Sequence, residues 1–319
     1  MALSDLAVFS EYTYSAMTEV QAQQVNLFNG ATRGGIVMQV GNHQGDYSDE
    51  AIWAKISGLV RRRNAYGSGS VGEKVLSHLT DTSVKVASGT PPVRIDPGML
   101  KWIQRSPEEA GVVVGKQMAE DSIADMLNTS VLAYVAALTP ITALTHDGTA
   151  ATMSLASLNK GASKFGDRSN AITSWVMHSK SAFDLYGEAL TNANRLFAFG
   201  NVRVIEDGFG RPLVVTDSDS LILTIPTPDH YLALGLTQGA IVVSQNGDFT
   251  DNIDTKNGDE NIVRTYQAEW TYNVGIQGFA WDKTNGGHSP TTAALGTSTN
   301  WDRYATSDKD LAGVMVKTL

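Results

Sequence analysis

The sequence predicts a fold of the α+β class, in which one long helix and several strands share a chain of 319 residues. Apolar residues recur at helical spacing from Ile123 to Leu138, as in an amphipathic helix, within a predicted helix at residues 107–138. Over residues 262–277 apolar and polar residues alternate instead, as in a strand with one buried face. Two β-rich runs flank the sequence DGFG at residues 207–210, which predicts a hairpin because glycine accepts a positive φ.

The long helix carries its own start signals. Ser106 supplies an N-cap oxygen, Pro107 suits the first helical position, and Glu109 stands where its carboxylate could reach back to the cap N–H. At about 1.5 Å per residue the helix would be roughly 48 Å long, far above the common length of about 11 to 12 residues. Gly111 and Gly115 are expected to bend its first third. Its predicted buried face consists of Ile123, Leu127, Val131, Tyr134 and Leu138.

Shorter elements follow from local patterns. Residues 172–178 predict a buried strand and residues 179–190 a helix. Residues 221–226 and 240–244 are apolar runs that continue the mixed pattern, whereas the Gly, Ser and Thr of residues 286–310 predict a surface segment. The predicted buried face of the shorter helix consists of Ala182, Phe183, Tyr186, Ala189 and Leu190. The apolar positions of the long strand are Ile262, Tyr266, Ala268, Trp270, Tyr272, Val274 and Ile276.

The N-terminal third predicts segments that extend from the body. Residues 1–50 mix apolar residues with Gln, Asn and Gly, without a sustained period that would bury one face, so we expect an extended or partly helical arm. Residues 51–98 are polar in the middle and end in prolines, with Val84 and Val86 alternating with polar neighbours as in a strand. We expect this second segment to be a long excursion rather than a packed unit.

Composition excludes several classes of function. The chain has no cysteine, so disulfides, thiolate catalysis and zinc held by thiolates are excluded. Its 24 Lys and Arg against 33 Asp and Glu give a net charge of −9, which argues against wrapping nucleic acid over the whole surface. The sequence begins without a signal-peptide pattern, and no stretch approaches the roughly 20 apolar residues that span a bilayer. We therefore expect a protein made in a cytoplasm.

The motif GSGSVG places Gly67, Gly69 and Gly72 at the spacing of dinucleotide-binding loops. A nucleotide site of that kind also needs a buried strand before the glycines, a helix after them and an acidic residue about 20 positions further on. Here three consecutive arginines precede the glycines, and the sequence GTPP at residues 89–92 occupies the acidic position. The sequence therefore favours an exposed, flexible loop over a phosphate site.

Other residue types that carry chemistry are not arranged as sites. No histidine has a second His at helical or strand spacing, and Ser68 and Ser70 lack the pattern of a hydrolase nucleophile elbow. An acidic stretch could hold a calcium ion, but its glycines miss the EF-hand position and a solvated loop is favoured. We expect no catalytic residue, cofactor or metal. The carboxylates of the acidic stretch are Asp248, Asp251, Asp254, Asp259 and Glu260, and the histidines are His43, His78, His146, His178, His230 and His288.

The order of these elements resembles the major capsid proteins of tailed bacteriophages, which share the HK97-type fold. The resemblance rests on TPPVRIDPGMLKW before the long helix, SPEEAGVVVGKQMAEDSIADMLNTSVLAYVAAL as the helix, SWVMHSKSAFDLYGEAL followed by GFGRPLVVTD, and YQAEWTYNVGIQGFAWD as the late strand. It implies an N-terminal arm at residues 1–50, an extended loop at 51–98 and the spine helix of a peripheral domain at 99–140. Residues 141–260 would be mainly an axial domain with part of the peripheral domain, and residues 261–319 return strands of the peripheral domain and a C-terminal tail.

The resemblance implies a structural role. Identical subunits would form hexamers and pentamers of an icosahedral shell, assembled in the cytoplasm of a bacterial host, around double-stranded DNA enclosed without sequence-specific binding. A negative inner wall would fit the acidic charge because it repels phosphate. Since arm-like sequence follows Met1 directly, we expect a separate scaffolding protein. A portal protein and decoration proteins are further implied partners, and a membrane is not.

The residues expected to contact a neighbouring subunit are charged side chains of the extended loop. Adjacent cations on an exposed excursion have no core to serve and would pair with carboxylates of another subunit. These candidates are Arg61, Arg62, Arg63, Glu73 and Lys74. The alternative function is another phage structural protein, such as a tail or adhesin component. A nucleotide-dependent enzyme that uses the glycine spacing is a third hypothesis, against which the residues around the glycines argue.

Overall fold

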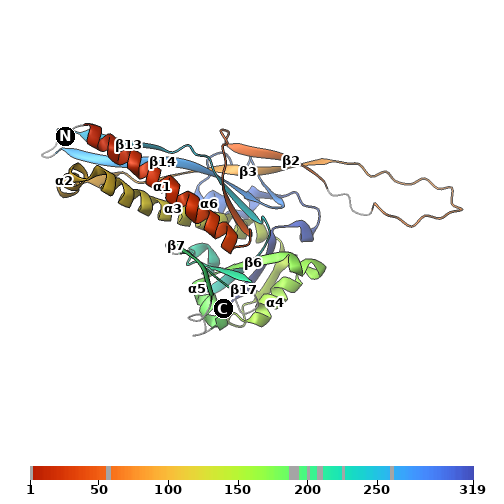
Figure 1. Cartoon of the computed structure of the whole chain (residues 1–319). Coiled ribbons are helices and arrows are strands. Elements are labelled where there is room, and N and C mark those ends of the chain that lie inside the picture. Colours follow the sequence, from red (N-terminus) through yellow and green to blue (C-terminus); the bar gives the residue numbers. More distant parts are fainter. Residues whose placement is uncertain are drawn as a thin grey trace.

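The structure is a computed structural model that describes residues 3–54, 59–186, 194–199, 202–206, 211–224, 227–258 and 262–319. Its helices are α1 (Leu3–Ala31), α2 (Pro97–Arg105), α3 (Pro107–Leu138), α4 (Leu155–Ser163), α5 (Ser179–Tyr186) and α6 (Thr292–Leu295). The two long helices, α1 and α3, lie side by side along one sheet, and a second sheet with shorter helices forms a separate layer (Figure 1). None of the described helices is both long enough and apolar enough to cross a membrane.

The larger sheet is built around one long strand, β14 (Val263–Ile276). Its other strands are β1 (Ile36–Val40), β2 (Tyr47–Trp53), β3 (His78–Gly89), β4 (Val93–Ile95), β12 (Ile241–Gln245), β13 (Thr250–Lys256), β15 (Phe279–Trp281) and β16 (Trp301–Arg303). β14 pairs antiparallel with β3, β4, β12, β13 and β15, so it joins strands from distant parts of the sequence. The predicted alternation holds from Tyr266 to Glu269, and Tyr272 and Val274 are buried as predicted, but Asn273 is buried too and Trp270 is only half-buried. Ile262 precedes the strand and is exposed.

The smaller sheet contains the apolar run near the C-terminus of the chain. Its strands are β5 (Thr145–Gly148), β6 (Ile172–Met177), β7 (Asn194–Phe199), β8 (Val202–Glu206), β9 (Pro212–Val215), β10 (Ile222–Leu223), β11 (His230–Thr237) and β17 (Gly313–Thr318). β17 lies between β5 and β11, and the predicted buried strand β6 lies between β11 and β9. β8 and β9 pair antiparallel as predicted for the hairpin, whose turn at residues 207–210 lies outside the described residues.

α3 is the core element shared by both sheets, and its predicted bounds and buried face are confirmed. The hydroxyl of Tyr134 donates to the carbonyl oxygen of Gly235 in β11 at 3.2 Å. The hydroxyl of Tyr272 in β14 donates to the Asp125 carboxylate at 2.9 Å. These bonds tie the helix to one strand of each sheet. The predicted capping box is wrong, because Ser106 occupies the N-cap position but its side chain makes no capping hydrogen bond.

The N-terminal region differs from the prediction, because α1 packs along α3 and buries one side, including Phe9 and Phe28. The close approach depends on Gly111 and Gly115 of α3. A Cβ at Gly115 would lie 2.4 Å from the carbonyl oxygen of Thr13, and one at Gly111 would also collide with the α1 backbone. The two glycines, which were predicted to bend α3, are therefore the contact surface for α1.

Two further predictions are wrong in part. Phe183 of α5 is exposed, although its neighbour Ala182 is buried as predicted. The segment at residues 286–310 enters the core, since Leu295 and Trp301 are buried and β16 extends the larger sheet. Two other members of the predicted α5 face, Ala189 and Leu190, lie outside the described residues.

Candidate assembly interface

The connection between β2 and β3 leaves the body of the molecule as a long loop. The two strands pair as far as Trp53 and His78, and the backbone N–H of Ala54 donates to the carbonyl oxygen of Ser77 at 2.9 Å. Residues 59–77, which we call the projecting segment, form no helix or strand, and all their side chains are exposed. Figure 1 shows this segment reaching away from both sheets.

All five residues predicted to contact a neighbour lie on the projecting segment. Arg61, Arg62 and Arg63 are on its outgoing half, and Glu73 and Lys74 are on its returning half. Every one of these side chains is exposed. Within the described part of the chain, no ion pair joins the three arginines to a carboxylate. Their positive charge is therefore available to another molecule.

A local turn separates the arginines from the glycines. The Asn64 side-chain oxygen accepts from the Tyr66 N–H at 3.1 Å, and its backbone carbonyl accepts from the Gly67 N–H at 3.2 Å. Gly69 and Gly72 have open space where a Cβ would stand, and neither has a positive φ. The segment lacks the preceding strand and following helix of a phosphate-binding loop, so the exposed-loop interpretation of the glycine spacing is confirmed.

Sequence reasoning missed the apolar side chains of the projecting segment. Tyr66 is 99% exposed and Val60 is 94% exposed, so neither packs against its own subunit. Large apolar groups gathered on one exposed segment are typical of protein–protein contact sites. The complete set is Leu59, Val60, Tyr66, Val71, Val75 and Leu76. The signal was present in the sequence as apolar residues without helical or strand spacing inside a polar, glycine-rich stretch.

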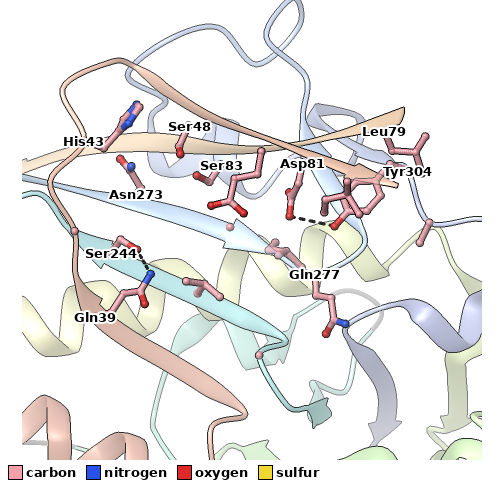
Figure 2. A pocket seen from close by; sticks show the side chains of 18 of the residues that line it. Gln39, His43, Ser48, Leu79, Asp81, Ser83, Ser244, Asn273, Gln277 and Tyr304 are labelled. Atoms are coloured by element: carbon pink, nitrogen blue, oxygen red, sulfur yellow. Dashed lines mark hydrogen bonds between the residues drawn. The ribbon is translucent and has the colours of Figure 1, made fainter. Parts of the chain in front are cut away.

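A cavity of about 660 Å³ lies at the base of the projecting segment, between the β2–β3 hairpin and strands β12 and β14 (Figure 2). Polar side chains from several elements line it, among them Gln39, Ser83, Asn273 and Gln277. Ile52, Trp53 and Leu79 add apolar side chains to the lining. The cavity combines segments from distant parts of the sequence, so no local pattern could predict it.

Three carboxylates line the cavity, of which Asp310 pairs with Arg168, whereas Glu50 and Asp81 form no ion pair within the described residues. Glu50 and Asp81 are directly opposite in the β2–β3 pairing, and both line the cavity. The Tyr304 hydroxyl donates to one Asp81 oxygen at 3.1 Å, while the other oxygen is buried without a hydrogen-bond partner among the described residues. Burial raises the pKa of Asp81 to about 6, and the charge of Glu50 acts in the same direction.

The acidic stretch considered for calcium is part of the larger sheet. Asp248 accepts from the backbone N–H and the hydroxyl of Thr271, and Asp251 of β13 accepts from the Ser10 hydroxyl. Asp259 and Glu260 lie outside the described residues. The residues that the structure describes include no cluster of three or more His, Cys, Asp or Glu side chains suited to a metal ion.

The fold is similar to that of known phage capsids. A chain of the cyanophage Pam1 capsid asymmetric unit aligns over 86% of this chain and 85% of that chain, with 10% identity and a TM-score of 0.50. A chain of Mycobacterium phage Bobi aligns over 91% and 89%, with 9% identity and a TM-score of 0.49. The acid-stable capsid of Helicobacter pylori bacteriophage KHP30 aligns over 91% and 89%, with 15% identity and a TM-score of 0.46. The first of these shows the α+β fold of HK97-type capsids.

The sequence itself matches a family of capsid proteins. No curated protein sequence matches the chain. A family model described as Gp13-like, major capsid protein 13-like, matches residues 5–315, which is nearly the whole chain. This match shows a structural role in the virion capsid. The chain therefore belongs to the Gp13-like family of major capsid proteins.

Proposed function

We propose that the chain forms hexamers and pentamers that tile an icosahedral shell around double-stranded DNA, and that the projecting segment of each subunit lies across its neighbour. The observation that carries this proposal is that one extended segment bears both exposed apolar side chains and arginines that form no ion pair within the described residues. A monomer gains nothing from such a segment, because water surrounds its apolar groups and no carboxylate among the described residues pairs with the arginines.

The energetics favour contact in a ring over contact between two isolated subunits. Fully burying one large apolar side chain contributes about 1.5–3 kcal/mol. Association costs at least about 4 kcal/mol in lost translational and rotational freedom. The apolar residues of one segment could offset that cost, and a closed ring would repeat the contact at every subunit. Cooperative assembly follows, with few free dimers.

We propose the following division of labour within the fold. Residues 51–98 serve as the extended loop, 99–140 contain the spine helix, 141–260 form mainly the axial domain, and 261–319 return to the peripheral domain. Residues 1–50 serve as an N-terminal arm, but one that includes a helix packed on its own subunit rather than an extended segment. Because α1 packs on α3, that region supports the spine helix of its own subunit as well as any neighbour it reaches.

Further partners are proposed from the chemistry of a DNA-filled shell. A separate scaffolding protein would guide assembly in the host cytoplasm, a portal protein would occupy one vertex, and decoration proteins could bind outside. The net charge of −9 supports a shell wall that encloses DNA without binding it tightly. A basic inner wall in an assembled particle would contradict this part of the proposal.

Expression of the chain with and without a candidate scaffolding protein tests the proposal. Size-exclusion chromatography and negative-stain microscopy should show shells, tubes or capsomer rings. A variant in which a Gly-Ser linker of equal length replaces residues 59–77 should remain folded and monomeric. A wild-type chain that stays monomeric at high concentration with every scaffold would contradict the proposal.

A further inference from the structure

The cavity at the base of the β2–β3 hairpin has a negative charge at Glu50 and Asp81 that no ion pair within the described residues balances. Glu50 and Asp81 lie on the same face of the hairpin as directly opposed residues, an arrangement that is destabilising for like charges. The described residues that line the cavity include no Lys or Arg. His43, a lining residue, contacts the carbonyl oxygen of Tyr47 at 2.6 Å.

Two cations form ion pairs with a lining residue of the cavity or with the residue next to one, Asp310 and Asp49. Lys283 pairs with Asp49 at 2.5 Å, and Arg168 pairs with Asp310 at 2.5 Å. Asp81 keeps one buried oxygen without a partner among the residues that the structure describes. A cationic group supplied from outside would therefore satisfy charge and hydrogen bonding together.

The lining of the cavity suits a guanidinium group in particular. Guanidinium presents five N–H donors in a plane, and it binds carboxylates with two parallel hydrogen bonds. The side-chain oxygens of Gln39, Ser48, Ser83 and Asn273 add acceptors around the acidic pair. The volume of about 660 Å³ lies within the usual range for ligand sites, about 300–1,000 Å³, and exceeds the needs of one side chain.

The same chain carries guanidinium groups that are exposed on the projecting segment. The arginines at residues 61–63 are exposed and make no ion pair within the described residues. They cannot serve the cavity of their own subunit in this conformation, because the segment that bears them leads away from the hairpin base (Figure 1). A second copy of the chain is therefore the partner that the charges favour.

We propose that an arginine of residues 61–63 enters the Glu50–Asp81 cavity of a neighbouring subunit. This inference rests on the proposed function and assigns the receiving site for the projecting segment. Tyr66 and Val60, close to the arginines in sequence, would then contact the apolar lining residues Ile52 and Trp53.

Disulfide crosslinking tests the inference. Because the chain has no cysteine, every disulfide that forms must involve an introduced cysteine. The test chain carries Arg62→Cys with Glu50→Cys, and the matched control carries Arg62→Cys with Asp121→Cys, an exposed carboxylate on α3. After mild oxidation of assembled particles, denaturing electrophoresis should show a ladder of linked subunits for the first pair and monomers for the control and for each single variant.

The outcomes separate this inference from the function on which it rests. Particles in which Arg62→Cys links to Asp121→Cys but not to Glu50→Cys would overturn the receiving site and leave the shell function intact. A fast-migrating monomer, linked within one chain, would overturn the inference too. Failure of the wild-type chain to assemble under any condition would remove the proposed function.

A double-mutant cycle that removes these charges measures the interaction between the two sites independently. Glu50→Gln should weaken subunit association by at least about tenfold, the lower end for close interfacial charge pairs. In a background with Arg61→Gln, Arg62→Gln and Arg63→Gln, the same change should have almost no further effect. Equal effects of Glu50→Gln in both backgrounds would show that the two sites do not interact.

Discussion

Replacing Gly115 with Ala should separate α1 from α3, because the two helices touch through this glycine. An added Cβ would lie 2.4 Å from the Thr13 carbonyl oxygen, 3.1 Å from the Ala16 Cβ and 3.2 Å from the Met17 backbone N. The first distance is 0.6 Å inside the 3.0 Å that real Cβ atoms respect. The atom met is backbone, so relief requires movement of the whole helix.

The expected cost follows from two opposing effects. Overpacking of a close contact costs about 1–3 kcal/mol. Ala is favoured over Gly in a helix interior by about 0.5–1 kcal/mol. The free energy of unfolding of Gly115→Ala should therefore fall by about 1–2 kcal/mol. Gly30→Ala in α1 is the matched control, since a Cβ there meets nothing within 4 Å, and its stability should be equal or higher.

Urea denaturation of the unassembled subunit, followed by circular dichroism, measures both variants under the same conditions. A Gly115→Ala variant as stable as Gly30→Ala would refute the close packing of α1 on α3. It would also restore the prediction that the N-terminal region is a free arm.

Three further predictions concern the cavity and the projecting segment. Burial raises the pKa of Asp81 from 3.8 to about 6, so the folded subunit binds this proton more tightly than the unfolded chain and loses stability as pH rises through that window. The expected effect is discounted because water in the open cavity screens the charge. Asp81→Asn should stabilise the unassembled subunit by about 1–2 kcal/mol at pH 8 and should leave its stability unchanged near pH 3. A difference in urea midpoint between variant and wild type that is the same at both pH values would contradict this. Replacing the three arginines at residues 61–63 with alanine should raise the critical concentration for assembly, measured by light scattering. The increase should be largest at low salt, where charge pairs are least screened. Arg105→Ala on α2, which is also exposed, is the control and should leave the critical concentration unchanged. Tyr66→Ser should weaken assembly by about tenfold and leave the stability of the free subunit within about 0.5 kcal/mol, and a destabilised subunit would show that Tyr66 packs on its own chain.

Local periodicity predicted the parts of α3 and β14 in which buried side chains recur at a fixed spacing. In α3 that part runs from Ile123 to Leu138, and in β14 it begins at Tyr266. The predicted capping box is wrong because Ser106 is both the C-cap residue of α2 and the N-cap residue of α3. Its backbone φ and ψ must therefore suit the end of one helix and the start of the next. A single sequence does not reveal that second constraint.

The helix α1 could not be predicted from periodicity, because its buried side depends on glycines in another helix. Gly111 and Gly115 lie about a hundred residues from the α1 residues they contact, and small residues give no apolar stripe. The charged members of the candidate interface were found from sequence because three arginines in a row are conspicuous. Val60 and Tyr66 were missed since they follow no period, and the cavity was missed since Glu50, Asp81 and Tyr304 meet only in the folded chain.

The placement of residues 59–77 in an assembled particle tests the central claim most directly. A cryo-electron microscopy reconstruction at side-chain resolution should show this segment lying on the adjacent subunit, with its apolar residues buried and an arginine of residues 61–63 beside Glu50 and Asp81. A reconstruction in which the segment projects into solvent, touching no neighbour, would contradict the account.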